Sequence, residues 1–370
     1  MFGKPFKTHN KPDYLLLGSI ILLLIIGIIM VFSSSYVWSD YKFGDAAFYL
    51  KRQLLFTVAG IISMFFIMLI PYATWKKYAK GILIACFVLL FLVLIPGVGM
   101  VRGGAQSWIG VGAFSIQPSE FMKLGLIIFL AAFLAANQKY ITSFKKGFFP
   151  SIILIFTAFG LIMLQPDLGT GMVLVLTCML MIFTAGAKLS HFFGLAAIGL
   201  AGFAGLIASA PYRISRITSF LNPWEDPLGD GFQIIQSLYA IGPGGLMGLG
   251  LGESLQKYFY LPEPQTDFIF AILGEELGFI GGAFVILLFG LLFWRGIKVA
   301  LEAPDAFSGF LALGIVSMLI LQAMINISVV IGLIPVTGIT LPFLSYGGSS
   351  LTLTLCSVGI LLNISKYTRV

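Results

Sequence analysis

Charged residues, cysteine and histidine are all scarce in this chain, and each shortage excludes a class of protein. Asp, Glu, Lys and Arg make up only 10% of its 370 residues, whereas 59% are hydrophobic, which excludes a soluble globular protein. The three cysteines, Cys86, Cys178 and Cys356, sit in apolar stretches without the spacing of a disulfide framework or a zinc site. A Gly-x-x-x-x-Gly-Lys-Ser/Thr motif is also absent, so we do not expect ATP hydrolysis.

Histidine occurs only twice, at His9 and His191, and both fall in segments that we place on the cytoplasmic side. Histidine is the side chain whose ordinary pKa best suits proton transfer near neutral pH. Proton transfer at the outer face of this protein therefore has to rely on a carboxylate.

Long apolar stretches dominate the rest of the chain. A membrane-spanning helix needs about 20 mostly apolar residues, and ten stretches meet that need. They are 14–33, 52–70, 79–95, 117–135, 149–164, 170–186, 189–209, 267–293, 307–332 and 341–362. The sequence thus predicts an all-α, polytopic membrane protein with about ten transmembrane helices, forming one domain over residues 1–370 with a large outer loop at 210–266. The first apolar stretch is too long for a cleavable signal peptide, and no suitable cleavage site follows it.

The distribution of charge predicts how the protein is oriented, because Lys and Arg concentrate in cytoplasmic loops. With the N-terminus in the cytoplasm, 14 of the 22 Lys and Arg residues fall on the inner side and seven on the outer side, while Lys123 lies within a span. Acidic residues show the opposite bias, so we expect both termini in the cytoplasm and the polar chemistry outside. The inner basic loops are short and lack interleaved aromatic residues, which argues against nucleic-acid binding.

The large loop ends at Asp267, and two more carboxylates follow within the next span. We expect Asp267 to begin the helix of span 267–293, where it could cap the helix or act as a base. Glu275 and Glu276 lie deeper, and ionisable groups in a bilayer usually pair, line a wet cavity or take part in chemistry. Structural pairing within the bundle is the favoured interpretation for both, and Glu275 is kept as a candidate for substrate binding.

Glu120 and Lys123 are three residues apart near the start of span 117–135, so they share one face of a helix. One interpretation is an ion pair inside the membrane domain. The other is that Lys123 meets an anionic substrate group such as pyrophosphate. The two interpretations are compatible, and the sequence leaves both open.

Five further residues are candidates for the substrate site, each with a plainer alternative. Trp108 lies in a glycine-rich loop and is either a membrane-interface residue or a sugar-stacking one. Asp167 either forms a turn between two spans or lines a cavity. Arg213 and Arg216 open the large loop and suit either lipid headgroups or a bound phosphate. Ser345, early in span 341–362, either allows close helix packing or lines a cavity.

Several long motifs now identify a resemblance. They are Leu-Pro-Glu-Pro-Gln-Thr-Asp-Phe-Ile-Phe-Ala-Ile-Leu-Gly-Glu-Glu-Leu-Gly at 261–278, Ile-Gln-Pro-Ser-Glu-Phe-Met-Lys at 116–123, Gln-Pro-Asp-Leu-Gly-Thr at 165–170, Asn-Pro-Trp-Glu-Asp-Pro at 222–227 and Leu-Pro-Phe-Leu-Ser-Tyr-Gly-Gly-Ser-Ser at 341–350. Together they resemble the SEDS family (shape, elongation, division and sporulation) over nearly the whole chain. The sequences of 261–278 and 222–227 are most similar to those of the sporulation members.

The resemblance implies an enzyme that polymerises lipid II into glycan strands at the outer face of the cytoplasmic membrane, beside a class B penicillin-binding protein that cross-links them. It assigns the catalytic aspartate to Asp267 and functional importance to Trp108, Glu120 and Lys123. Lipid II is a polyprenyl pyrophosphate disaccharide, so its tail would need a lateral groove between helices, open to membrane lipid. Its pyrophosphate would need cations, for which Lys123, Arg213, Arg216 and Mg²⁺ are candidates.

Two other functions remain open at this point. One is a lipid II flippase, which would need polar sites reaching both faces of the membrane. The other is a non-catalytic scaffold for the penicillin-binding protein, in which substitutions at the catalytic site would leave function intact.

Overall fold

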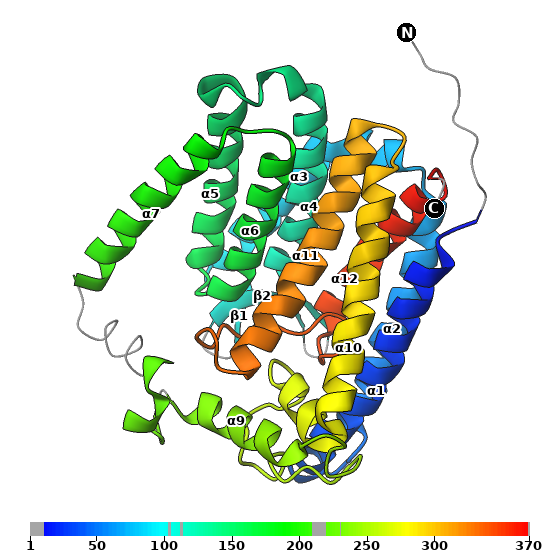
Figure 1. Ribbon diagram of the computed structural model, residues 1–370, viewed down its shortest axis with the longest axis vertical. Coiled ribbons are helices and arrows are strands. Elements are labelled where there is room, and N and C mark those ends of the chain that lie inside the picture. Colours follow the sequence, from blue (N-terminus) through cyan, green and yellow to red (C-terminus); the bar gives the residue numbers. More distant parts are fainter. Residues whose placement is uncertain (1–10, 103–104, 112–113, 209–219, 230, 369–370) are drawn as a thin grey trace.

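The computed structural model describes residues 11–102, 105–111, 114–208, 220–229 and 231–368. Most of them form a bundle of long helices (Figure 1). The helices are α1 Tyr14–Phe43, α2 Phe48–Leu69, α3 Tyr72–Leu94, α4 Pro118–Ala136, α5 Phe149–Met163, α6 Leu168–Thr184, α7 Leu189–Ala208, α9 Phe232–Gly244, α10 Ile269–Leu301, α11 Ala306–Val330 and α12 Gly348–Ser365. Strands β1 Gly99–Arg102, β2 Ala105–Val111 and β3 Phe114–Ile116 form a small antiparallel sheet in the order β1-β2-β3.

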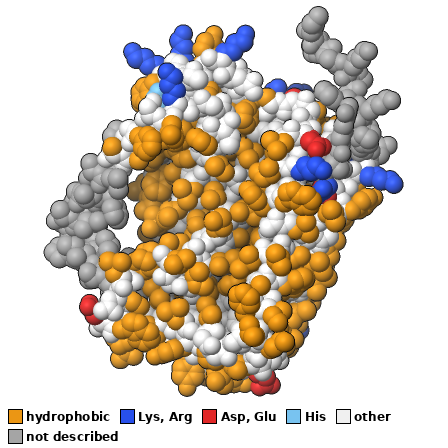
Figure 2. Space-filling model, in the orientation of Figure 1, with side chains coloured by type: hydrophobic (Ala, Val, Ile, Leu, Met, Phe, Trp, Pro, Cys, Tyr) orange, Lys and Arg blue, Asp and Glu red, His pale blue; other side chains and the backbone are white. Residues whose placement is uncertain are grey.

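Each of the ten predicted spans corresponds to a helix, which confirms the all-α polytopic fold. In the described part of the chain, eight helices are long and apolar enough to cross a membrane, and α6 is shorter at 17 residues. Helix α9 lies across one end of the bundle (Figure 1), within the segment predicted as the large loop. Hydrophobic side chains cover the middle of the face in Figure 2, where a membrane would surround the protein.

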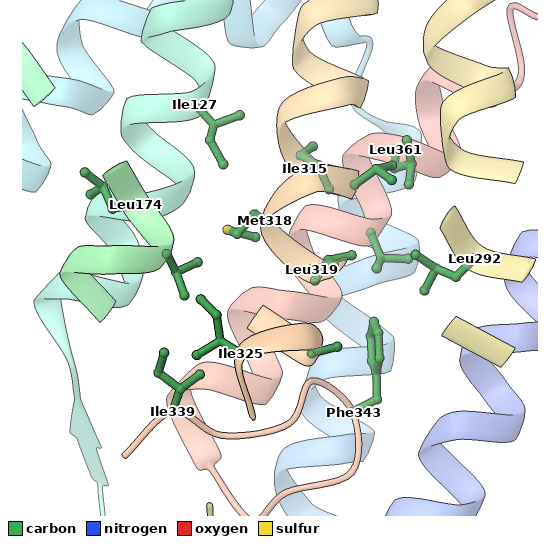
Figure 3. Packing of buried hydrophobic residues seen from close by; sticks show 14 of the residues in the cluster. Ile127, Leu174, Leu292, Ile315, Met318, Leu319, Ile325, Ile339, Phe343 and Leu361 are labelled. Carbon is green, nitrogen blue, oxygen red and sulfur yellow. The ribbon is translucent and has the colours of Figure 1, made fainter. Parts of the chain in front are cut away.

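The centre of the bundle is filled by α4, α6, α10, α11 and α12. Figure 3 shows how side chains from these helices meet, among them Ile127 of α4, Met318 of α11 and Leu361 of α12. Ile127 and Leu361 are buried, and many hydrophobic side chains of the peripheral α2 and α3 are exposed. Apolar residues all round a helix predict either burial or contact with lipid. The central helices bury many apolar side chains, and α2 and α3 expose apolar side chains where lipid would lie.

Several predicted boundaries were wrong, among them the end of α10, which continues to Leu301 rather than stopping at residue 293. Helix α1 continues to Phe43 instead of ending near residue 33, because Ser33, Ser34 and Ser35 are buried and bond to neighbouring groups rather than stopping the helix. Gly44, with a φ of 65°, ends it. Helix α3 begins at Tyr72 rather than at residue 79.

The last span was also misplaced at its start, because residues 341–347 are not helical and α12 begins only at Gly348. Ser345 therefore lies before the helix instead of early within it. Its hydroxyl accepts a hydrogen bond from the Leu341 amide at 2.7 Å and its carbonyl accepts one from the Gln53 side chain at 3.2 Å. These bonds stabilise a loop conformation that competes with the helix.

Helix α10 is broken at Gly278, which has a φ of 65° and a ψ of −163°. The carbonyls of Glu275 and Glu276 accept hydrogen bonds from the amides of Leu249 and Gly250, at 2.9 and 3.0 Å. Beyond the break, the amides of Phe279 and Ile280 donate to the carbonyls of Gly245 and Leu246, at 2.9 and 3.1 Å. Backbone groups freed by a break in a membrane helix must find such partners, and the glycine-rich run at 242–252 supplies them.

We expect Gly278→Ala to destabilise the protein. A Cβ at this position would meet the Gly248 amide and the Leu246 carbonyl, and this combination of φ and ψ is essentially confined to glycine, at a cost of about 1–3 kcal/mol for other residues. Gly290→Ala is the matched control, since it lies in the same helix with nothing within 4 Å of the new Cβ. Thermal unfolding should show a lower melting temperature for Gly278→Ala only, and equal melting temperatures would contradict the role of the break.

Candidate active site around Asp267

Asp267 lies just before α10, at the end of the bundle crossed by α9. It does not cap the helix as expected: the N-cap is Phe268, and the Asp267 carboxylate instead accepts a hydrogen bond from the Thr266 hydroxyl at 2.8 Å. The reason is a turn, in which the Thr266 amide donates to the Glu263 carbonyl at 3.0 Å and delays the start of the helix. The residue as a whole is partly exposed.

The environment of Asp267 raises the pKa of its carboxyl above the ordinary value. Burial of the group is the main cause, and the charge of Glu263 adds to it, while hydrogen bonds from Thr266 and from its own backbone act in the opposite direction. A carboxylate acts best as a general base when its pKa lies nearer the working pH. The direction of this shift therefore suits a base.

Asn326 of α11 fixes the backbone at Asp267. Its side-chain amide donates to the carbonyls of Asp267 and Ile339, both at 2.7 Å, and the residue is buried. The amide of Tyr346 donates to the carbonyl of Gln265 at 2.8 Å. The segment that carries Asp267 is thus held against the loop between α11 and α12. Asn326 was not predicted as a site residue, although a lone amide side chain inside an apolar span is a signal of such a role.

Glu120 and Lys123 form the expected ion pair. Their charged atoms are 2.8 Å apart, and both side chains are buried. The Lys123 ammonium also donates to Gln322 at 2.9 Å, and the Ser350 hydroxyl donates to Glu120 at 3.1 Å. Gln322 in turn donates to the carbonyl of Thr340 at 3.0 Å. The pair therefore joins α4, α11 and α12 and reaches the same loop that Asn326 holds.

Asp167 connects the start of α6 to the start of α4. Its carboxylate accepts hydrogen bonds from the Thr170 amide at 3.1 Å, the Gln117 side chain at 2.9 Å and the Ser119 hydroxyl at 3.1 Å. It caps α6, so of the two interpretations the structure shows the turn-forming one. Trp108 lies in β2, partly buried and opposite Met100 of β1. Arg213 and Arg216 lie outside the described residues.

Glu275 and Glu276 form a second buried cluster in which the sequence analysis missed one partner, Lys257. The ammonium of Lys257 is 2.9 Å from the Glu276 carboxylate, and neither side chain is exposed. Glu276 also accepts from the Ser33 hydroxyl of α1 at 2.7 Å, and Glu275 accepts from the Leu255 amide at 2.9 Å. Pairing within the bundle, the favoured interpretation, is what the structure shows. No short-range spacing predicts the ion pair of Lys257, because its partner Glu276 is 19 residues away in the sequence.

A cavity of about 490 Å³ lies beside the Asp267 segment. Its walls are formed by the end of the large loop at Pro262, by α9 and by the loop after α11 at Pro335 and Val336. Within the described ranges, no group of three or more His, Cys, Asp or Glu side chains is arranged to hold a metal ion. The segment that carries Asp267 thus contributes one wall residue, Pro262, to this cavity.

The family profile for FtsW, RodA and SpoVE, described as cell cycle protein, matches residues 13–370. The chain belongs to this family. Membership confirms the resemblance to the SEDS proteins that the motifs indicated.

Two relatives show how similar the chain is to known sequences. It is 67% identical over 360 residues to stage V sporulation protein E of Bacillus subtilis (strain 168), covering 97% of this chain and 98% of that protein. It is 45% identical over 357 residues to the "Probable peptidoglycan glycosyltransferase FtsW" of Geobacter sp. (strain M18), covering 96% and 97% of the two chains.

Solved structures give the same result for the fold. A chain from a study of structural coordination of polymerization and crosslinking by a peptidoglycan synthase complex has a TM-score of 0.81 and 31% identity, over 96% of this chain and 97% of that one. The rod shape determining protein RodA of Thermus thermophilus has a TM-score of 0.71 and 27% identity, over 97% and 98%. The protein is therefore a multi-pass membrane protein of the RodA fold.

Removing either partner of the Glu120–Lys123 pair should destabilise the protein. Lys123→Met or Glu120→Gln leaves an uncompensated buried group, at a cost of about 3–5 kcal/mol for a charge. Lys51→Met is the control, because Lys51 and Asp45 form an ion pair of 2.7 Å that is exposed, and such a pair contributes only about 0–1 kcal/mol. Thermal unfolding of the purified variants measures the difference. A Lys123→Met protein of normal stability that no longer binds lipid II would instead support a direct role in anion binding.

Proposed function

We propose that this protein is a peptidoglycan glycosyltransferase that polymerises lipid II at the outer face of the cytoplasmic membrane, with Asp267 as the general base. The observation that carries the proposal is the position of Asp267, a partly exposed residue with a raised pKa at the end of the bundle crossed by α9, in a segment whose Pro262 lines a cavity. The name of the Geobacter relative and the subject of the peptidoglycan synthase structure support the same reaction.

The proposed reaction is a single displacement. A hydroxyl of the acceptor sugar attacks the anomeric carbon of the donor, and its proton passes to the Asp267 carboxylate. The bond between the anomeric carbon and the pyrophosphate oxygen breaks, and the polyprenyl pyrophosphate leaves as an anion. Because that leaving group is stable without a proton, one base is enough, and a second carboxylate acting as an acid is not needed.

The remaining predicted residues take supporting roles in this proposal. Lys123 is already engaged by Glu120 and Gln322, so we assign it to the framework below the site. Arg213 and Arg216 then remain the candidates for the pyrophosphate. A Mg²⁺ ion is a further candidate, and it would supply charge neutralisation to the pyrophosphate when bound. Trp108 and Ser345 are proposed to shape the acceptor side and the loop around Asp267.

Partner, orientation and biological role follow the same proposal. The similarity to a chain from a synthase complex supports a class B penicillin-binding protein as the partner. Asp13 at the start of α1 and Ser365 at the end of α12 are joined by a hydrogen bond of 3.1 Å, which supports placing both termini on one side, opposite Asp267. The 67% identity to stage V sporulation protein E supports a role in spore cortex synthesis.

Asp267→Asn should abolish polymerisation without unfolding the protein. The amide oxygen can still accept the Thr266 hydrogen bond, but the base is lost, and general-base catalysis contributes about 10²–10⁴-fold. Glu263→Gln is the matched control, an exposed carboxyl in the same turn, and it should retain most activity. The assay is glycan synthesis from lipid II by purified protein with its partner. Normal polymerisation by folded Asp267→Asn would exclude Asp267 as the base, and transport of lipid II without polymer would favour a flippase.

The pH dependence of polymerisation should reflect the shifted pKa of Asp267. The base must be ionised, so activity should fall with decreasing pH at a value above about 3.9, the ordinary pKa of Asp. Glu263 is one of the causes that raise the pKa, so Glu263→Gln should move this loss of activity to lower pH. A shift toward higher pH in Glu263→Gln would contradict the assignment.

A further inference from the structure

Lys257 is a loop lysine with no exposed side-chain surface, which is rare for this residue unless its charge is paired. Its ammonium meets the Glu276 carboxylate at 2.9 Å, donates to the carbonyl of Gly252 and lies 4.9 Å from the centre of the Tyr36 ring. Glu276 and Tyr36 belong to α10 and α1. Lys257 therefore brings together the large loop and two membrane helices.

Three neighbouring loop residues bond to the two carboxylates ahead of the break in α10. The Ser254 hydroxyl and the Leu255 amide donate to Glu275, and the Lys257 ammonium donates to Glu276. A short backbone ladder from residues 245–250 holds the same part of α10, on both sides of Gly278. The segment 245–257 is thus fastened to α10 by side chains as well as by backbone.

Only ten positions separate Lys257 from Asp267, and parts of the connecting chain are held in place. Leu261 and Gln265 are buried, and Asn326 holds the carbonyl of Asp267 at 2.7 Å. The segment that carries the proposed base is therefore held at its start by Lys257 and at its end by Asn326, with the Tyr346 amide bonded to the Gln265 carbonyl between them. Loss of the Lys257 ion pair would release the start of the segment while its end stays bonded to Asn326. We expect this to let Asp267 shift.

We propose that Lys257 is a positioning residue for Asp267, acting through its ion pair with Glu276 at the break in α10. The proposal rests on the proposed function, because it concerns the geometry of the base in that reaction. Lys257 does not touch the substrate in this account. It sets the position of the segment 253–268, and a misplacement of about 1 Å at a reacting group can lower a rate by about 10²-fold.

The structure contains a matched control for a purely stabilising role. Arg295 and Asp13 also form a buried ion pair, 2.8 Å apart, that joins α10 to the start of α1. This pair links the same two helices at the opposite end of α10, far from the break. If Lys257 only stabilised the fold, the loss of Arg295 should affect the enzyme in the same way.

The experiment compares Lys257→Met, the double variant Lys257→Met with Glu276→Gln, and Arg295→Met, all in the full-length protein reconstituted in lipid nanodiscs with its partner. Melting temperature, kcat and KM for lipid II, and amide hydrogen exchange of residues 245–268 are measured. We expect kcat to fall about 10–100-fold in both Lys257 variants, with KM changed less than about threefold and exchange of 253–268 increased. The double variant should recover melting temperature, because no unpaired charge remains, without recovering kcat. Arg295→Met should lose melting temperature and keep its kcat.

Two results would overturn the inference: wild-type kcat and wild-type exchange in the folded double variant, or an equal loss of kcat in Arg295→Met. Failure of the proposed function is distinguishable from both, since it would appear as a lack of polymerisation by the wild-type protein itself. In that case the exchange measurement still decides whether Lys257 anchors the segment. If Lys257→Met does not fold, the double variant, which leaves no uncompensated charge, decides the question alone.

Discussion

A buried polar group in a membrane bundle must find its partner within the protein, and this constraint shapes the whole structure. The bundle contains three buried ion pairs among its described residues: Arg295–Asp13, Lys123–Glu120 and Lys257–Glu276. Each pair, with its hydrogen-bonded neighbours, joins different helices or fastens a loop to them. Such pairs add little net stability compared with apolar packing, but breaking one is costly. They therefore fix which helices adjoin and how the segments at one end are held.

Asp267 differs from every carboxylate in these pairs, because no cation of the described residues forms an ion pair with it. Its backbone is held by Asn326 and its side chain accepts a local bond from Thr266, while the residue as a whole stays partly exposed. Burial raises its pKa, and within the described part of the chain no cation is among the causes that lower it. A carboxylate fixed in place, with its charge not taken up by an ion pair of the described framework, is what a general base requires. The carboxylates of the three pairs are each bonded to a cation, whereas Asp267 is bonded to none of the described cations, and this difference supports Asp267 as the base.

Much of the fold could be predicted because its signals are local. Apolar stretches of spanning length located ten of the eleven described α-helices, and the spacing of Glu120 and Lys123 predicted their ion pair. The partner of Glu276 could not be found in this way, since Lys257 is distant in sequence and looks like an ordinary loop cation. The break at Gly278 was missed because glycine is common in membrane helices, and the glycine-rich run that completes it gives no signal of its own.

The errors around the site have a tertiary cause. The loop at 341–347 is as apolar as a helix and is fixed by bonds to Gln53 and Gln265, which lie far away in the sequence. Asp267 was found as a residue, but its turn was mistaken for a helix cap. Hydrogen bonds between distant segments decide both conformations, and a pattern of neighbouring residues does not contain them.

The most direct test of the central claim is a structure of the Asp267→Asn protein with its partner and bound lipid II in a lipid nanodisc. The account predicts that the side-chain amide replacing the Asp267 carboxylate lies within about 2.6–3.2 Å of the attacking hydroxyl of the acceptor sugar, with the donor pyrophosphate on the opposite side of the anomeric carbon. A reacting carbon held beside another carboxylate, with residue 267 out of reach, would contradict the account.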